Sequence, residues 1–134
     1  MGKYAEKAAG YFHQGYNCAQ SVLGAFSDVT GLDEKSAMKL ASPFGGGMGG
    51  TRELCGAVSA MALVLAFTEG YDAPDEPQKK ALYARIQALT GKFRQENGSL
   101  SCRELLSNLK PDGKTDRPCT RFVLSAAEIL EAYL

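Results

Sequence analysis

The stretch LCGAVSAMALVLAF, residues 54–67, decides the fold of this chain, because it is the longest apolar run and carries no charge. A bilayer-spanning helix needs about 20 apolar residues, so this run is too short to cross a membrane. Its length suits a helix buried in the core of a globular domain. The polar, proline-bearing segment EGYDAPDEP (residues 69–77) follows the run and is typical of a linker. We therefore expect a core helix and no membrane insertion.

A glycine-rich segment leads into this helix. Residues 44–57, FGGGMGGTRELCGA, contain six glycines and end on Cys55 and its two successors. Glycine is used where the backbone bends tightly or approaches another group closely. We interpret the segment as a turn that ends one helix and presents the next, with Thr51 as its N-cap and Cys55 near its start. The N–H groups of this loop are candidates for cradling sulfur or an anionic cofactor, and the residues concerned are Gly46, Gly47, Gly49 and Gly50.

Helical periodicity extends over almost the whole chain, and no segment alternates as a half-buried strand does. At 134 residues the chain is long enough to bury a core as one domain, residues 1–134. We expect an all-α protein, a compact helical bundle of six or seven helices with the glycine-rich loop before the fourth. The predicted helices cover residues 3–13, 18–28, 34–41, 51–68, 76–96 and 102–110, and a last one runs through FVLSAAEILEAYL (122–134).

Capping residues predict where several of these helices begin. Asn17 and Asp33 are suited to cap the second and third helices. Ser101 and Glu104 form an S-x-x-E capping box at the start of the sixth. Pro118 stands where a proline commonly begins a helix, ahead of the last one.

Charge and the N-terminal sequence narrow the classes of partner and the compartment. Fifteen basic residues balance fifteen acidic ones without a basic run, which argues against nucleic acid as a partner. Residues 1–18, MGKYAEKAAGYFHQGYNC, contain no apolar stretch of the signal-peptide type, so we expect a cytoplasmic protein. A homodimer formed through the apolar helix or through AAEILEAYL (126–134) is compatible with the sequence.

The four cysteines all fall at predicted helix starts. Cys18 follows the cap Asn17, and Cys55 lies within the first turns after Thr51. The remaining two, Cys102 and Cys119, follow Ser101 and Pro118. The first turn of a helix has free N–H groups and a partial positive charge, which stabilise a thiolate and lower its pKa. We expect the four helix starts to converge on one site.

The spacing of the cysteines excludes the common short motifs. Successive cysteines are 37, 47 and 17 residues apart, so the chain has no C-x-x-C. This excludes a thioredoxin-type motif and a haem-attachment motif, and argues against a zinc knuckle. A reducing compartment also disfavours a structural disulfide framework. Two arrangements remain: long-range assembly of one site, and one or two redox-switchable disulfides.

The arrangement resembles the C_GCAxxG_C_C family of redox-active proteins. The resemblance rests on CGA (residues 55–57) behind a glycine-rich loop, on Cys18 within YNCAQSVL, and on two cysteines downstream. Two positions depart from the pattern: Leu54 precedes Cys55, and Ala60 stands where the motif closes with glycine. Neither departure removes a cysteine.

The resemblance implies an all-helical fold and a redox role for the four cysteines. It also implies a redox partner and a link with transporter systems. A related module occurs in a cytochrome that also holds an iron–sulfur centre, which keeps cluster binding open.

Three functions follow from these observations. In the first, Cys18, Cys55, Cys102 and Cys119 are catalytic in thiol–disulfide exchange without a cofactor, as in a thiol–disulfide oxidoreductase, with Cys55 the nucleophile. In the second, the same four cysteines are metal ligands in an electron-transfer module that holds an iron–sulfur cluster or, less readily, zinc. In the third, the protein is a helical adaptor with buried cysteines and no redox role.

For the other polar residues near the cysteines, structural or solvent-exposed roles are favoured over chemical ones. His13 ends the first predicted helix, where a histidine interacts favourably with the helix dipole. Arg52 and Arg103 precede or follow a cysteine, but neighbouring helical residues point different ways, so we expect both in solvent. Arg117 and Arg121 flank Cys119 and are candidates for holding an anion, or are simply solvated.

Overall fold

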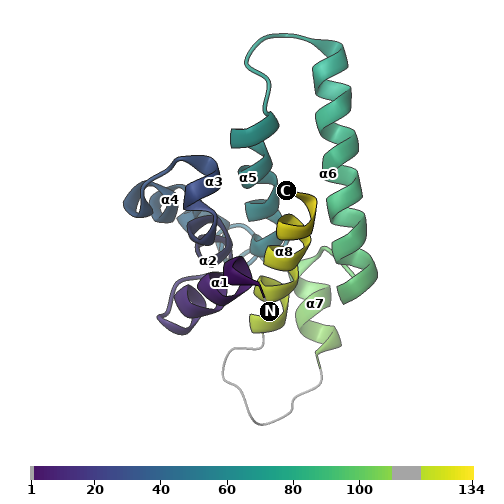
Figure 1. Ribbon diagram of the computed structural model, residues 1–134. Coiled ribbons are helices and arrows are strands. Elements are labelled where there is room, and N and C mark those ends of the chain that lie inside the picture. Colours follow the sequence, from purple (N-terminus) through teal and green to yellow (C-terminus); the bar gives the residue numbers. More distant parts are fainter. Residues whose placement is uncertain (1, 110–118) are drawn as a thin grey trace.

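The computed structural model describes residues 2–109 and 119–134, which form eight α-helices and one 3₁₀ helix (Figure 1). Their order is α1 (Lys3–His13), α2 (Cys18–Ala25), α3 (Ser27–Thr30), α4 (Glu34–Ala41), η1 (Ser42–Phe44), α5 (Gly56–Glu69), α6 (Glu76–Asn97), α7 (Cys102–Asn108) and α8 (Thr120–Tyr133). The all-α prediction is confirmed. The predicted loop over residues 111–118, with Arg117 and Pro118, lies outside the described residues.

The predicted number of helices, six or seven, was too low. The segment predicted as one helix over residues 18–28 is two, because Phe26 leaves the helical conformation at φ −104°, ψ 27° and α3 begins after it. Gly31 ends α3 in the left-handed conformation at φ 79°. As a result the glycine-rich segment precedes the fifth helix rather than the fourth.

The predicted caps of α2 and α4 are confirmed. Asn17 accepts a hydrogen bond from the backbone N–H of Gln20 at 2.9 Å, and the Gln20 side chain accepts one from the N–H of Asn17 at 3.0 Å. The two bonds form a full capping box, in which each residue satisfies a free N–H of the other. Asp33 caps α4 by accepting from the N–H of Ser36.

Only half of the predicted capping box of α7 forms. Ser101 accepts from the N–H of Glu104 at 3.3 Å. The Glu104 carboxylate accepts from the Ser99 hydroxyl instead of returning to Ser101, and the Ser101 N–H donates to the same Ser99 hydroxyl. Ser99 therefore supplies the second half of the cap.

The prediction that Thr51 caps the core helix was wrong. The core helix α5 begins at Gly56, and its N-cap is Cys55. The Thr51 hydroxyl donates instead to the carbonyls of Gly47 and Met48, each at 2.8 Å. Thr51 thus closes the glycine-rich turn rather than opening the helix.

Residues 46–50 form a left-handed turn, which we call the αL turn. All five have positive φ, between 59° and 81°. This conformation costs an L-residue about 1–2 kcal/mol, whereas glycine adopts it without steric penalty. Backbone bonds from Arg52 to Gly46 and from Glu53 to Gly47, both 2.9 Å, close the turn. The run of glycines is therefore required by backbone conformation.

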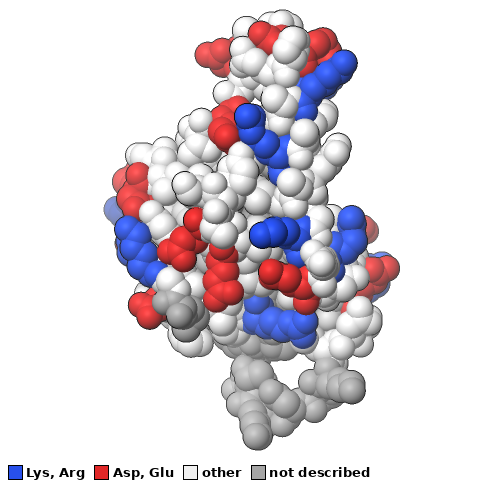
Figure 2. Space-filling view, turned by 45° about the vertical axis from the view of Figure 1, so that its right-hand side comes forward, with Lys and Arg blue, Asp and Glu red and all other residues white. Residues whose placement is uncertain are grey.

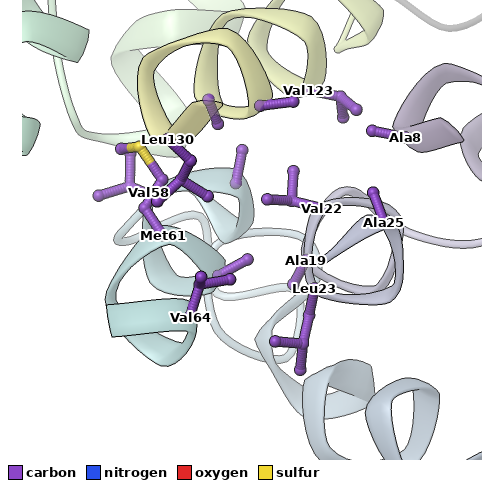
Figure 3. Packing of buried hydrophobic residues seen from close by; sticks show 14 of the residues in the cluster. Ala8, Ala19, Val22, Leu23, Ala25, Val58, Met61, Val64, Val123 and Leu130 are labelled. Atoms are coloured by element: carbon purple, nitrogen blue, oxygen red, sulfur yellow. The ribbon is translucent and has the colours of Figure 1, made fainter. Parts of the chain in front are cut away.

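The core lies between α2, α5 and α8 (Figure 3). Val22 of α2, Val58 and Met61 of α5, and Val123 and Leu130 of α8 are almost wholly buried and face one another there. Full burial of such a side chain contributes about 1.5–3 kcal/mol. Helix α1 packs on α8 and α2, and α4 packs on α2. The middle of the apolar run thus lies at the centre of the protein, whereas Leu54 and Phe67 at its two ends are exposed.

The long helix α6 stands beside this core and follows α5 through a turn at one end of the molecule (Figure 1). Its buried residues, Leu89, Phe93 and Asn97, all lie in its C-terminal half. There the Asn97 amide donates to the Ser125 hydroxyl at 2.9 Å, and that hydroxyl donates to the Glu96 carboxylate at 2.8 Å. This polar contact joins α6 to α8.

Acidic and basic side chains are interspersed on the face that Figure 2 shows. Within residues 2–109 and 119–134, no helix combines the length and the apolar character needed to cross a membrane.

Candidate four-cysteine site

All four cysteines lie at helix N-termini, as predicted. Cys18 and Cys102 are the first residues of α2 and α7, and Cys55 and Cys119 are the N-caps of α5 and α8. The structure shows all four as cysteines outside any disulfide, and all line one pocket of about 220 Å³, which we call the cysteine pocket. The other residues that line it are Phe12, Asn17, Gly46, Arg52, Gly56, Leu105, Leu106 and Phe122.

A short backbone pairing brings two of these helix starts together. Leu54 and Ser101 form an isolated antiparallel bridge. Beside it, the Cys55 N–H donates to the Leu100 carbonyl at 2.9 Å, and the Cys102 N–H donates to the Glu53 carbonyl at 2.6 Å. Cys55 and Cys102 therefore follow directly on the same bridge, although 47 residues separate them in sequence.

Gly56 allows the sulfur of Cys18 to lie against the start of α5. A Cβ at Gly56 would lie 2.6 Å from the Cys18 sulfur and 2.8 Å from the Phe44 carbonyl oxygen. No side chain fits there without displacing one of them. Gly56 was not predicted as a site residue. Its position directly after Cys55 was the one signal in the sequence that it belongs to the site.

Two of the four glycines predicted to hold a cofactor reach the cysteines. Gly46 lines the cysteine pocket, and its backbone N–H hydrogen-bonds the Cys18 sulfur. Gly47 is buried, and a Cβ there would lie 2.6 Å from the Cβ of Cys102. Gly49 and Gly50 are exposed members of the αL turn and do not line the pocket. Their place in the structure is explained by backbone conformation.

Burial, not the helix start, controls the ionisation of Cys55 and Cys18. Burial raises the pKa of Cys55 to about 12, and the nearby Cys18 adds to the effect. The N–H groups of Ala57 and Val58 favour the Cys55 thiolate but do not outweigh desolvation. Burial likewise raises the pKa of Cys18, against the hydrogen bond from Gly46. The prediction of lowered pKa values was therefore wrong for these two cysteines.

The arginines differ in their relation to the pocket. Arg52 is exposed, as expected, but its guanidinium also donates towards the Cys102 sulfur, with 3.8 Å between Nη1 and Sγ. Arg103 and Arg121 donate instead to the carbonyls of Thr51 and Glu96. His13 ends α1 and does not line the cysteine pocket.

The His, Cys, Asp and Glu side chains of the described residues do not form a metal centre. Within the described ranges, 2–109 and 119–134, no three His, Cys, Asp or Glu side chains are gathered so that they could hold a metal ion. Four thiols are chemically the donor set of an iron–sulfur cluster or a structural zinc ion. Their arrangement here gives neither group geometric support.

The structure thus defines an all-α protein in which four cysteines from four helix starts share one pocket. The family model described as "Putative redox-active protein (C_GCAxxG_C_C)" matches residues 16–133, and the chain belongs to this family. No curated protein and no solved structure matches the chain.

Proposed function

We propose that the cysteine pocket is a thiol–disulfide redox centre. The observation that carries this proposal is that four cysteines, from four separate helix starts, line a single pocket. Cys18 interacts electrostatically with both Cys102 and Cys55, which supports a role for Cys18 in exchange within the pocket. A match to a family of redox-active proteins supports the same conclusion.

In this function, two pocket thiols reduce a disulfide of a partner molecule. Oxidation of the two thiols to one protein disulfide releases two electrons and two protons. The disulfide of the partner molecule accepts these two electrons and two protons and is reduced to two thiols. A dithiol in the cell then restores the pocket by the reverse exchange.

Burial divides the four cysteines between different roles. Cys18 and Cys119 are half-buried, whereas Cys102 and Cys55 are only 7% and 5% exposed, and Cys55 also has a pKa raised to about 12. A thiolate is the attacking species, so Cys55 is poorly suited to begin the exchange at neutral pH. We assign Cys55 to a later step within the pocket, in place of its predicted role as nucleophile.

The proposal is tested on protein purified without oxygen. The absorption spectrum, iron, sulfide and zinc contents, and thiol count are measured on one sample, which is then titrated with oxidised dithiothreitol. We expect metal-free protein with four thiols that loses two or four of them reversibly. The matched control is Cys18→Ser, in which disulfides that use Cys18 cannot form.

Two outcomes would overturn the proposal. Visible charge-transfer bands with stoichiometric iron and sulfide would make the cysteines cluster ligands. Four thiols that remain reduced throughout the titration would favour the adaptor interpretation.

A further inference from the structure

The backbone of Arg52 is held in an unusual conformation. Its φ of 64° lies in the left-handed region, which is strained for any residue with a side chain. Its N–H donates to the Gly46 carbonyl at 2.9 Å, and its carbonyl accepts from the Arg103 N–H at 3.1 Å. These bonds hold the residue between the αL turn and the start of α7. A strained residue of this kind at a pocket is a candidate for function.

The side chain of Arg52 brings a positive charge to the cysteine pocket. Its Nη1 lies 3.8 Å from the Cys102 sulfur, and Arg52 lines the same pocket as the thiols. In the described part of the chain, no carboxylate forms an ion pair with it. Much of the remaining lining is apolar and includes Phe12, Leu105 and Phe122. The guanidinium is therefore available to an anionic ligand.

We infer that Arg52 makes the cysteine pocket selective for small anionic disulfides, those that carry carboxylates, and directs them to Cys102. This inference rests on the proposed redox function and names its substrate class. A guanidinium binds a carboxylate through paired hydrogen bonds, which orient the ligand as well as attract it. A carboxylate on Arg52 would hold the ligand's disulfide beside the sulfur of Cys102.

The exchange then balances in two steps. The Cys102 sulfur attacks one sulfur of the ligand's S–S bond, a mixed disulfide forms at Cys102, and the other half leaves as a thiol with the Cys102 proton. Cys18 next attacks the Cys102 sulfur, forms the Cys18–Cys102 disulfide, and releases the second half as a thiol with its own proton. One substrate disulfide is reduced to two thiols, and two cysteines are oxidised.

The chain supplies a matched control in Arg103. This arginine follows Cys102 directly in sequence, but its guanidinium donates to the Thr51 carbonyl at 3.3 Å and does not line the cysteine pocket. Arg103→Gln therefore removes a positive charge that is adjacent to Cys102 in sequence but lies outside the pocket. Arg52→Gly removes the charge at the pocket while leaving a residue that adopts φ 64° without strain.

The test compares two alkylating reagents on the reduced protein. Iodoacetate is anionic, whereas iodoacetamide is neutral. Because both reagents react only with the thiolate, the ratio of their rates does not depend on the fraction of Cys102 that is ionised. The rates at Cys102 are followed by peptide mass spectrometry. We expect Arg52→Gly to lower the iodoacetate-to-iodoacetamide ratio about fivefold, from the Coulomb energy of one nearby charge at high dielectric. Arg52→Lys should keep most of the wild-type ratio, and Arg103→Gln all of it.

An unchanged ratio in Arg52→Gly would overturn the inference, and so would a ratio in Arg52→Lys as low as in Arg52→Gly. Because alkylation needs no disulfide cycle, the ratio tests Arg52 even if the redox function itself fails. A second measurement uses the substrate class directly: wild type should be oxidised faster by the anionic dithiodiglycolate than by the cationic cystamine. This preference should disappear in Arg52→Gly, and its persistence there would contradict the inference.

Discussion

The side-chain space of Gly56 is occupied by the sulfur of Cys18, which lies 2.6 Å from where a Cβ at Gly56 would stand. The glycine that follows Cys55 therefore serves a thiol on another helix. This close approach makes the first turns of α2 and α5 one structural unit of the cysteine pocket.

Gly56→Ala should destabilise the protein by about 1–3 kcal/mol, the usual range for an overpacked site. It should also change the reactivity of Cys18, because the sulfur must move. The free energy of unfolding in urea and the alkylation rate of Cys18 report the two effects. Gly91→Ala in α6 is the control: no atom lies within 4 Å of the added Cβ, so it should stabilise the helix by about 0.5–1 kcal/mol. Equal effects of the two substitutions would contradict the packing at Gly56.

Met48 is the only residue of the αL turn with a side chain, and it is 45% exposed. Met48→Gly should stabilise the protein by about 0.5–1 kcal/mol, because relief of the left-handed strain exceeds the entropy cost of glycine. Met48→Val should destabilise it, since a β-branched residue fits this conformation worst. Urea unfolding of both variants checks the order, and a more stable valine variant would refute it.

The protein should lose stability at alkaline pH through Cys55. Its pKa is about 12 in the folded state, against about 8.5 for an unfolded cysteine. The Cys55 thiol therefore stays protonated to a higher pH in the folded state than in the unfolded state. The free energy of unfolding is at its full value below about pH 8.5 and falls as the pH rises towards 12. Cys55→Ser should make this fall shallower, while the serine keeps an N-cap oxygen for α5. The measurement is the urea midpoint at pH 7, 9 and 10.5.

The alkaline slope should not vanish in Cys55→Ser, because the raised pKa of Cys18 acts in the same direction. A slope identical to that of wild type would show that Cys55 ionises normally in the folded protein.

Ser125→Ala should cost about 1–2 kcal/mol. The Ser125 hydroxyl accepts from the buried Asn97 amide and donates to Glu96, so its loss weakens the contact between α6 and α8. Ser107→Ala is the control, since Ser107 is exposed and, among the described residues, donates to the Glu104 carbonyl within its own helix. It should change the unfolding free energy by less than about 0.5 kcal/mol. Comparable losses in both would contradict the role of Ser125.

Local signals in the sequence were sufficient for most of the fold. The spacing of apolar residues and the caps Asn17 and Asp33 predicted most of the helices, because these signals act within one or two turns. The break at Phe26 was missed since no glycine or proline marks it. Thr51 was predicted to be a helix cap. The left-handed backbone before it instead brings the carbonyls of Gly47 and Met48 within hydrogen-bond distance of its hydroxyl.

The site was predictable as a set of cysteines at helix starts but not in its contacts. Arg52 reaches Cys102 only because the αL turn sets its direction, and an isolated pairing at Leu54 and Ser101 joins segments far apart in sequence. The raised pKa of Cys55 depends on burial by several helices. Such long-range effects leave no periodic signature in the sequence.

The dependence of the pocket on α8 has a consequence for biosynthesis. Cys119 caps α8, and α8 packs against α1, α2, α5 and α6. During translation, the thiols of Cys18, Cys55 and Cys102 therefore leave the ribosome before the helix that completes their enclosure. Until α8 docks, the nascent chain exposes these thiols to any oxidant. A non-native disulfide formed at that stage must be reduced before the protein can fold.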